Sequence, residues 1–317
     1  MKRGYKYLLI SVLVLSLLMM AFPLTTGSAK PEKVMTIAKN VKPPATQPPE
    51  STPWGITRVN AIPAASAVDE SSVFVAILDT GMDLDHPDLA ANYVWGWDLV
   101  NDDAYPEDDN GHGTHCAGTV AAIDNDIGVI GVAPNVGLYI IKVLNRRGSG
   151  SYTDIADGII MVTNGPDGNP GTADDANVIS MSLSGPVSDP YLESAVNYAL
   201  SYDVVIVAAT GNDGEDEPRY PAAYPGVIKV GATDIDDNIA SWSNRGETIL
   251  APGVSILSTY LAANYATASG TSMATPHVAG VTALAWAAHS SYSGVQIRLL
   301  VEGSADSAGV VNALAVI

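Results

Sequence analysis

From about residue 54 onward, short apolar runs alternate with longer segments of helical periodicity. Residues 73–78, 178–179 and 204–209 are almost wholly apolar, which is typical of parallel strands buried on both faces. Four other segments have the spacing of helices, namely residues 112–123, 152–163, 190–201 and 272–289. This alternation predicts a three-layer α/β fold, with a central, mostly parallel sheet and helices on both faces.

The N-terminal part of the chain has a different pattern. A basic start and an apolar run over residues 8–24 precede small residues at 27–29, so we interpret residues 1–29 as a secretory signal peptide. A membrane anchor is the alternative, because the run is close to the lower length limit for a bilayer span. Residues 30–50 are rich in Pro and Lys and are interpreted as a linker or short pro-segment. Residues 51–317 then form one large domain.

The overall charge narrows the range of functions. The chain has 317 residues and a formal net charge of −19, which excludes nucleic-acid binding as its main function, since that requires a basic face. Its single cysteine, Cys116, excludes an intramolecular disulfide and a cysteine-based zinc cluster. We therefore expect an acidic, secreted, extracellular monomer, with no stable membrane association after the signal is cleaved. Its acidic surface suits bound calcium.

Three polar motifs lie at the ends of predicted elements. Asp79 follows the strand at 73–78, at the edge where open α/β sheets place their active sites. His112 opens a helix rich in small residues, and Ser272 precedes a long apolar helix, whose free N–H groups would stabilise a developing oxyanion. Simple capping is the alternative for Asp79 and Ser272. Metal ligation by His112, His115 and Cys116 is disfavoured, because no fourth ligand lies nearby in the sequence.

Together these motifs supply a carboxylate, a base and a nucleophile. A serine hydroxyl needs a base to accept its proton, and a buried carboxylate can fix the tautomer of that base. The order Asp79, His112, Ser272 differs from the Ser-Asp-His order of α/β-hydrolases. Asn212 lies just beyond the strand at 204–209, where its amide would provide a second hydrogen bond to a substrate carbonyl oxygen.

From about Pro53 to the C-terminus, the sequence resembles the subtilisin-like serine proteases, or subtilases. The motifs around Asp79, His112 and Ser272 occur in family order, in a style closest to thermitase-like and archaeal subtilisins. The resemblance implies a subtilisin-like fold and a secreted serine endopeptidase with broad polypeptide substrates. It assigns orientation of the base to Asp79, general acid–base catalysis to His112, nucleophilic attack to Ser272 and oxyanion binding to Asn212.

Two other functions are compatible with parts of this pattern. A non-enzymatic scaffold on a protease fold is disfavoured because the triad and Asn212 are intact. A peptide ligase would use the same acyl-enzyme, and the sequence leaves it open. The segment 30–50 is also shorter than the folding pro-domain that secreted subtilases usually carry.

The resemblance further implies a substrate cleft between two strands, with broad recognition through main-chain pairing. Arg219, just before Tyr220-Pro221, would lie at the floor of the specificity pocket and favour Glu before the scissile bond. Alternatively, Arg219 pairs with Asp213, Glu215 or Glu217, and an apolar preference returns. The substrate-binding residues implied are Gly148, Ser149, Gly150, Ser182, Leu183, Ser184, Gly185, Ala209, Gly211 and Arg219.

Calcium is the expected cofactor, because hard oxygen ligands gather in two acidic loops. By resemblance, the first site combines the side chains of Asp88 and Asn125 with the carbonyls of Ile123, Ile127 and Val129, and Glu50 is a further candidate ligand. The second uses Asp98 and Asp103, with Asn101 and Glu107 as further candidates. The acidic insertion at 167–175 is a third, weaker candidate. An acidic solvated surface is the alternative for all three.

Overall fold

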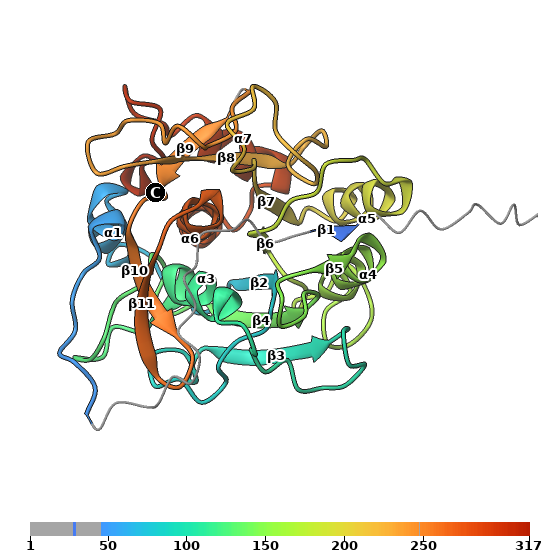
Figure 1. The fold of residues 1–317 in the computed structure, drawn as a ribbon, viewed down its shortest axis with the longest axis horizontal. Coiled ribbons are helices and arrows are strands. Elements are labelled where there is room, and N and C mark those ends of the chain that lie inside the picture. The colour runs from blue at the N-terminus through green and yellow to red at the C-terminus, as the bar shows by residue number, and fades with distance from the viewer. Residues whose placement is uncertain (1–27, 30–45, 247) are drawn as a thin grey trace, which may run out of the picture.

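The computed structural model describes residues 28–29, 46–246 and 248–317. Its centre is a seven-stranded sheet in which all neighbouring strands are parallel, in the order β3-β4-β2-β6-β7-β8-β9 (Figure 1). The predicted α/β fold with a parallel central sheet is confirmed. The strands are β2 (Phe74–Asp79), β3 (Tyr93–Asp98), β4 (Gly137–Lys142), β6 (Val178–Met181), β7 (Val205–Ala209), β8 (Ile228–Thr233) and β9 (Ile249–Pro252).

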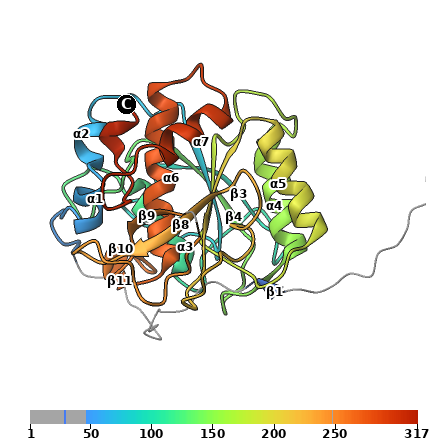
Figure 2. The same cartoon turned by 90° about the horizontal axis from the view of Figure 1, so that it is seen from above.

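Helices cover both faces of the sheet. On one side lie α3 (His112–Ala121) and α6 (Thr271–Ala288), and on the other α4 (Tyr152–Thr163) and α5 (Pro190–Ser201) (Figure 2). The bounds of α4 and α5 are those predicted, since Ser151 and Asp189 cap the two helices through their side chains. The observed α3 ends two residues before the predicted one, and α6 begins and ends one residue earlier than predicted.

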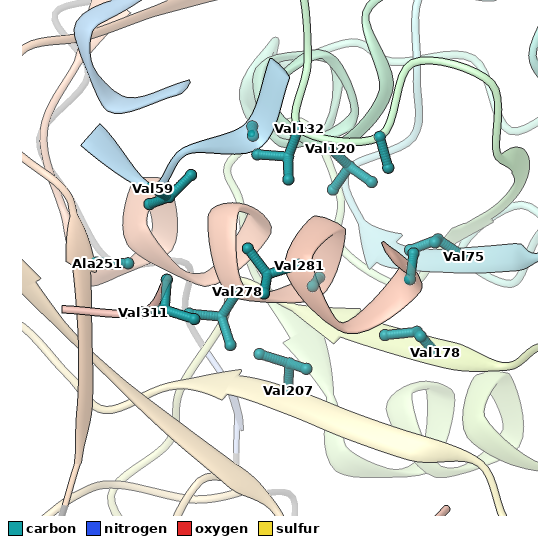
Figure 3. Packing of buried hydrophobic residues seen from close by; sticks show 14 of the residues in the cluster. Val59, Val75, Val120, Val132, Val178, Val207, Ala251, Val278, Val281 and Val311 are labelled. Atoms are coloured by element: carbon teal, nitrogen blue, oxygen red, sulfur yellow. The ribbon is translucent and has the colours of Figure 1, made fainter. Parts of the chain in front are cut away.

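Each face of the sheet has its own hydrophobic core. Along β2, Val75 and Ile77 belong to the core beneath α3 and α6, whereas Ala76 and Leu78 belong to the core beneath α4 and α5. This alternation follows from the two-residue period of a strand. In the first core, valines of α6 lie among valines of β2, β6 and β7 (Figure 3). Burial on both faces makes the sheet a rigid support for residues at its edge.

Several shorter elements complete the described chain. They are α1 (Trp54–Arg58), α2 (Ala61–Ala65), α7 (Gly294–Glu302), the 3₁₀ helix η1 (Ala313–Ala315), the hairpin β10 (Ile256–Tyr260) and β11 (Asn264–Ala268), and the two-stranded pair β1 (Ser28–Ala29) and β5 (Gly150–Ser151). In the described residues, no helix is both long and apolar enough to cross a bilayer. Except for Ser28 and Ala29 at its end, the predicted signal peptide lies outside the described residues, as does most of the segment 30–50.

Candidate active site

The three motif residues are placed by three different elements. Asp79 is the last residue of β2, His112 is the first residue of α3, and Ser272 is the second residue of α6. All three side chains are buried. Because the strands are parallel, their carboxyl ends lie along one edge of the sheet, and this edge carries the candidate active site.

Asp79 holds the imidazole of His112. The two carboxylate oxygens lie 2.7 and 2.9 Å from Nδ1 of His112, which fixes that nitrogen as the protonated one. Nε2 of His112 is buried and has no hydrogen-bond partner among the described residues. This close approach requires glycine at position 113, because a Cβ there would lie 2.1 Å from the carbonyl oxygen of Gly81. The imidazole therefore presents an unpaired, basic nitrogen inside the site.

Two opposing effects act on the pKa of His112. Burial lowers this pKa, while the negative charge of Asp79 and its hydrogen bond raise it, and the net result is a pKa well above the ordinary value. Burial also raises the pKa of the neighbouring Cys116 thiol, which therefore stays neutral and adds no charge of its own. Asp79 is the group that stabilises the imidazolium.

A second carboxylate, Asp108, joins the strand end to the helix start. It accepts a hydrogen bond from the Thr80 hydroxyl at 2.8 Å and two from Thr114, through its amide and its hydroxyl. The Thr80 oxygen in turn accepts the Gly113 N–H at 2.9 Å. This clamp fixes Asp79 relative to His112. This role of Asp108 was not predicted from the sequence, although an aspartate four residues before His112 is a recognisable candidate for stabilising the start of α3.

Ser272 is held by an interruption of the α6 hydrogen-bond pattern. Pro276 has no N–H to donate to the Ser272 carbonyl four residues earlier. That carbonyl instead accepts the Ser182 hydroxyl at 2.8 Å and the Cys116 thiol at 3.6 Å. The Ser272 hydroxyl donates to the Ser182 carbonyl at 3.1 Å. Since the Cys116 sulfur is also 3.9 Å from Nδ1 of His112, serine and histidine pack against the same thiol.

The side-chain amide of Asn212 uses its oxygen in hydrogen bonds, and its nitrogen has no partner among the described residues. Its Oδ1 accepts hydrogen bonds from the Thr271 amide at 2.9 Å and the Thr271 hydroxyl at 3.1 Å. These bonds fix the orientation of the side-chain amide. Nδ2 is left buried with no partner among the described residues, and a Cβ on Gly270 would lie 3.3 Å from it. A buried, unpaired donor beside the start of α6 is well suited to a developing negative charge.

The comparisons with known proteins agree with this geometry. Residues 70–315 match the subtilase family. The chain belongs to the subtilases. Subtilisin Savinase from Lederbergia lenta is 47% identical over 267 residues, covering 83% of this chain and 94% of the relative. Thermitase from Thermoactinomyces vulgaris is 43% identical over 259 residues, covering 81% and 89%. The protein is a serine-type, subtilisin-like endopeptidase that acts on polypeptides.

One predicted substrate strand of this subtilase already has a partner strand. β5 pairs antiparallel with β1, with Ser28 opposite Ser151 and Ala29 opposite Gly150. Position 150 requires glycine, because the Cβ of any other residue would clash with the Val143 carbonyl oxygen, at 2.2 Å. The β5 edge thus accepts an extended peptide, and here that peptide is a segment of the same chain.

The other residues predicted for substrate binding lie at the same edge of the sheet. Ser182 directly follows β6, and Ala209 ends β7. Gly185 pairs with Tyr220 through hydrogen bonds of 2.7 and 3.0 Å, so its backbone is used within the protein. Gly148 and Gly211 adopt positive φ, at 66° and 123°. Leu183 and Ser184 are buried between these segments, and Ser149 accepts a backbone hydrogen bond from Asn145.

Arg219 adopts the alternative arrangement considered from the sequence. Its guanidinium lies 2.9 Å from Asp213 and 3.3 Å from Glu215 on the same loop. Two carboxylates therefore already neutralise this cation. The structure therefore does not favour the expected attraction of a substrate glutamate by Arg219.

The first predicted calcium loop contains a buried carboxylate without a cationic partner among the described residues. The oxygens of Asp88 accept hydrogen bonds from neutral amides, at 3.1 Å from Asn125 Nδ2 and at 3.1 Å from Val129 N. The neutral Tyr265 hydroxyl also interacts with this carboxylate, and burial together with the carboxylate raises the pKa of Tyr265. In the described part of the chain, the carbonyl oxygens of Ile123, Ile127 and Val129 accept no hydrogen bond. Carbonyl and carboxylate oxygens of this kind fit calcium. Glu50 reaches the loop as well, accepting the Asn125 N–H at 2.9 Å.

In the second predicted calcium loop, the predicted ligands lie in different surroundings. Asp98 is buried and accepts hydrogen bonds from Val100 and from the backbone and side chain of Asn101, so Asn101 presents its nitrogen to Asp98. Asp103 is joined to Asp98 through the backbone. Glu107 interacts instead with the Leu84 amide, and burial raises its pKa to about 7. The structure thus places Asp103 beside Asp98 through the backbone and Glu107 beside Leu84, and calcium binding by this loop stays a prediction.

Proposed function

We propose that this subtilase cleaves peptide bonds through an acyl-enzyme, with Ser272 as nucleophile, His112 as general base and acid, and Asp79 as the group that orients His112. The observation that carries the proposal is the Asp79–His112 contact, which leaves the buried Nε2 of His112 unpaired. Rotation of the Ser272 hydroxyl away from the Ser182 carbonyl would direct it to this nitrogen. The same contact fixes which imidazole tautomer is present.

The reaction follows from these groups. Oγ of Ser272 forms a bond to the substrate carbonyl carbon while its proton passes to Nε2 of His112. The carbonyl oxygen becomes an oxyanion, which accepts hydrogen bonds from Nδ2 of Asn212 and from the Ser272 N–H, a group without an intrahelical acceptor at the start of α6. His112 then protonates the amine as the C–N bond breaks. Water repeats these steps to release the acid.

Labelling tests this assignment directly. A peptidyl phosphonate should form one covalent adduct on Ser272 and stop casein hydrolysis in the same proportion. Peptide mapping by mass spectrometry locates the adduct. An adduct on another residue, with activity lost in parallel, would contradict the proposed nucleophile.

The pH dependence of activity should reflect the raised pKa of His112. Only the neutral imidazole can accept the serine proton, so activity appears as the pH rises through the folded-state pKa. Because Asp79 raises this pKa above the ordinary value of about 6.5, half-maximal kcat/KM is expected above pH 6.5. A profile measured from pH 4 to 10 checks this, and a midpoint well below 6.5 would show that Asp79 does not dominate.

We also propose that calcium stabilises the fold through the Asp88 loop. Chelation should lower the melting temperature, because a ligand that binds only the native state contributes about 3 kcal/mol at a hundredfold excess over its dissociation constant. Asp88→Asn should abolish the response of the melting temperature to calcium. Asp126→Asn is the matched control, since Asp126 is exposed in the same loop and has a positive φ that asparagine tolerates. Equal loss of the response in both variants would assign the effect to loop charge alone.

Cys116 makes the site sensitive to soft metals. Asp79, His112 and Cys116 place ligand atoms within 4.8 Å of one another, the one such group of three found among the described residues. A mercurial bound to the Cys116 sulfur would displace His112, so we expect loss of activity in a stoichiometric titration. Cys116→Ala should remain active and resist the reagent. Equal inhibition of both proteins would place the mercury elsewhere.

Secretion is the remaining part of the proposal. The basic start and the apolar run at 8–24 support export and cleavage near residue 29, and the acidic domain supports a soluble, extracellular monomer without nucleic-acid partners. N-terminal sequencing of protein from the culture medium tests the cleavage position.

A further inference from the structure

A groove away from the active site has aromatic walls and a carboxylate. It lies between the edge strand β3, the helix α4 and the first residues of α5, with a volume of about 490 Å³. This volume falls in the range of small-ligand sites. We call it the aromatic groove and define it by Trp95, Trp97, Asp157, Asn164 and Tyr191.

The rings of the groove are held in place. Trp95 packs edge-on against Tyr139, with ring centroids 5.5 Å apart and an interplanar angle of 84°. Trp97 is half-buried two residues along the same strand, so both indoles extend from one face of β3. Tyr191 is 44% exposed at the start of α5. The fixed rings offer aromatic faces and edges at little further cost in side-chain entropy.

The polar groups of the groove favour a cation. Oδ1 of Asp157 accepts the Tyr191 hydroxyl at 2.5 Å, while Oδ2 accepts no hydrogen bond from the described residues. No basic side chain of the described chain lines the groove, and the acidic segment with Asp167 continues from its rim at Pro166 and Gly168. Aromatic faces attract ammonium and guanidinium groups, and Trp does so most strongly.

Helix α4 runs from β5, the predicted substrate strand, to the aromatic groove. It begins directly after β5, and Asp157 and Asn164 lie about 8 and 18 Å along its axis from Tyr152. In the β1–β5 pair, the N-terminal side of the bound strand points toward α4. An extended chain covers about 3.3 Å per residue, so a substrate that follows α4 would need some three to six further residues upstream to reach the groove.

We propose that the aromatic groove binds a lysine or arginine side chain of a polypeptide substrate, upstream of the residues paired with β5. The inference rests on the proposed peptidase function and on the expected pairing of substrate with β5, but occupancy of the groove can be measured without catalysis. The aliphatic part of the side chain lies along the indoles, and its charged end pairs with Asp157.

Binding is tested on Ser272→Ala protein with N-acetyl-lysine methylamide as the probe, followed by tryptophan fluorescence and NMR. The uncharged N-acetyl-norleucine methylamide should bind more weakly. Asp157→Asn should weaken binding of the lysine probe by about two- to fivefold. Asp154→Asn, one turn earlier on α4 and outside the groove, should leave it unchanged. Equal binding of both probes, or an equal loss in both variants, would overturn the proposal.

A second experiment connects the groove to substrate choice. In a peptide series with one lysine moved along the upstream positions, kcat/KM should rise severalfold where the lysine reaches the groove. This maximum should disappear in Asp157→Asn and persist in Asp154→Asn. If the parent protein is active but its kcat/KM does not depend on the position of the lysine, the role of the aromatic groove in substrate binding is overturned. If the parent protein is inactive, the proposed hydrolysis is overturned, and the binding measurement still tests the groove.

Discussion

Replacing Ser272 by alanine is expected to lower peptide hydrolysis by roughly 10⁶-fold, a magnitude carried over from subtilisin, in which the same change was measured. The physical reason is the loss of the one hydroxyl that His112 can activate. The fold should persist, because the hydroxyl contributes a single hydrogen bond, to the Ser182 carbonyl at 3.1 Å. Alanine is also the residue most favourable to a helix. Turnover of a chromogenic peptide and a thermal melt measure the two effects.

A buried serine outside the site provides the matched control. Ser180 lies in β6, and its hydroxyl has no partner among the described residues. Ser180→Ala should therefore preserve both turnover and stability. If Ser272→Ala kept more than a small fraction of the parent activity, with no contaminating protease, another residue would have to be the nucleophile.

The sequence predicted best those elements whose ends carry local signals. Helices α4 and α5 have the predicted bounds because Ser151 caps one and the Asp189-Pro190 pair begins the other. Strand β4 was missed although it lies inside the sheet, between β3 and β2. It ends in Lys142, a residue type that is rarely buried, and only the folded chain supplies its partners, the Asp109 carboxylate at 2.7 Å and the Thr80 carbonyl at 2.6 Å.

The edge strand β3 was missed for a different reason. Its half-buried aromatic residues Tyr93, Trp95 and Trp97 alternate with exposed or fully buried positions, so the strand lacks the aliphatic run that marks the buried strands. The hairpin of β10 and β11 was likewise missed, because β11 is mostly half-exposed. Tertiary contacts with neighbouring strands, rather than local pattern, define these elements.

In the active site, too, the residues with local sequence signals were predicted, and those that depend on long-range contacts were not. Asp79, His112, Asn212 and Ser272 were predicted because each lies in a motif beside a recognisable strand or helix. Their supports were not, since these contacts join distant parts of the chain. The Ser182 hydroxyl reaches the Ser272 carbonyl across 90 residues of sequence, and Thr80 reaches Asp108 across 28. Pro276 was visible in the sequence, but the carbonyl that it leaves free has meaning only once Ser182 and Cys116 are placed beside it.

Asn212→Ala is expected to lower kcat by roughly 10²–10³-fold with little change in KM, the range known for the oxyanion asparagine of subtilisin. An interaction that strengthens only as negative charge develops lowers kcat and kcat/KM equally when it is removed. The observation behind this prediction is the buried, unpaired Nδ2 of Asn212.

Asn212 also has a structural role, and a second variant separates the two. Its Oδ1 accepts both the amide and the hydroxyl of Thr271 at the start of α6, so alanine removes an acceptor as well as a donor. Asn212→Asp keeps the acceptor and the size of the side chain but loses the N–H donor, and its charge repels an oxyanion. If the donor matters, Asn212→Asp should lose at least as much kcat as Asn212→Ala while keeping a higher melting temperature. Near-parent turnover in Asn212→Asp would instead assign Asn212 to positioning α6, and the Ser272 N–H would then have to bind the oxyanion without it.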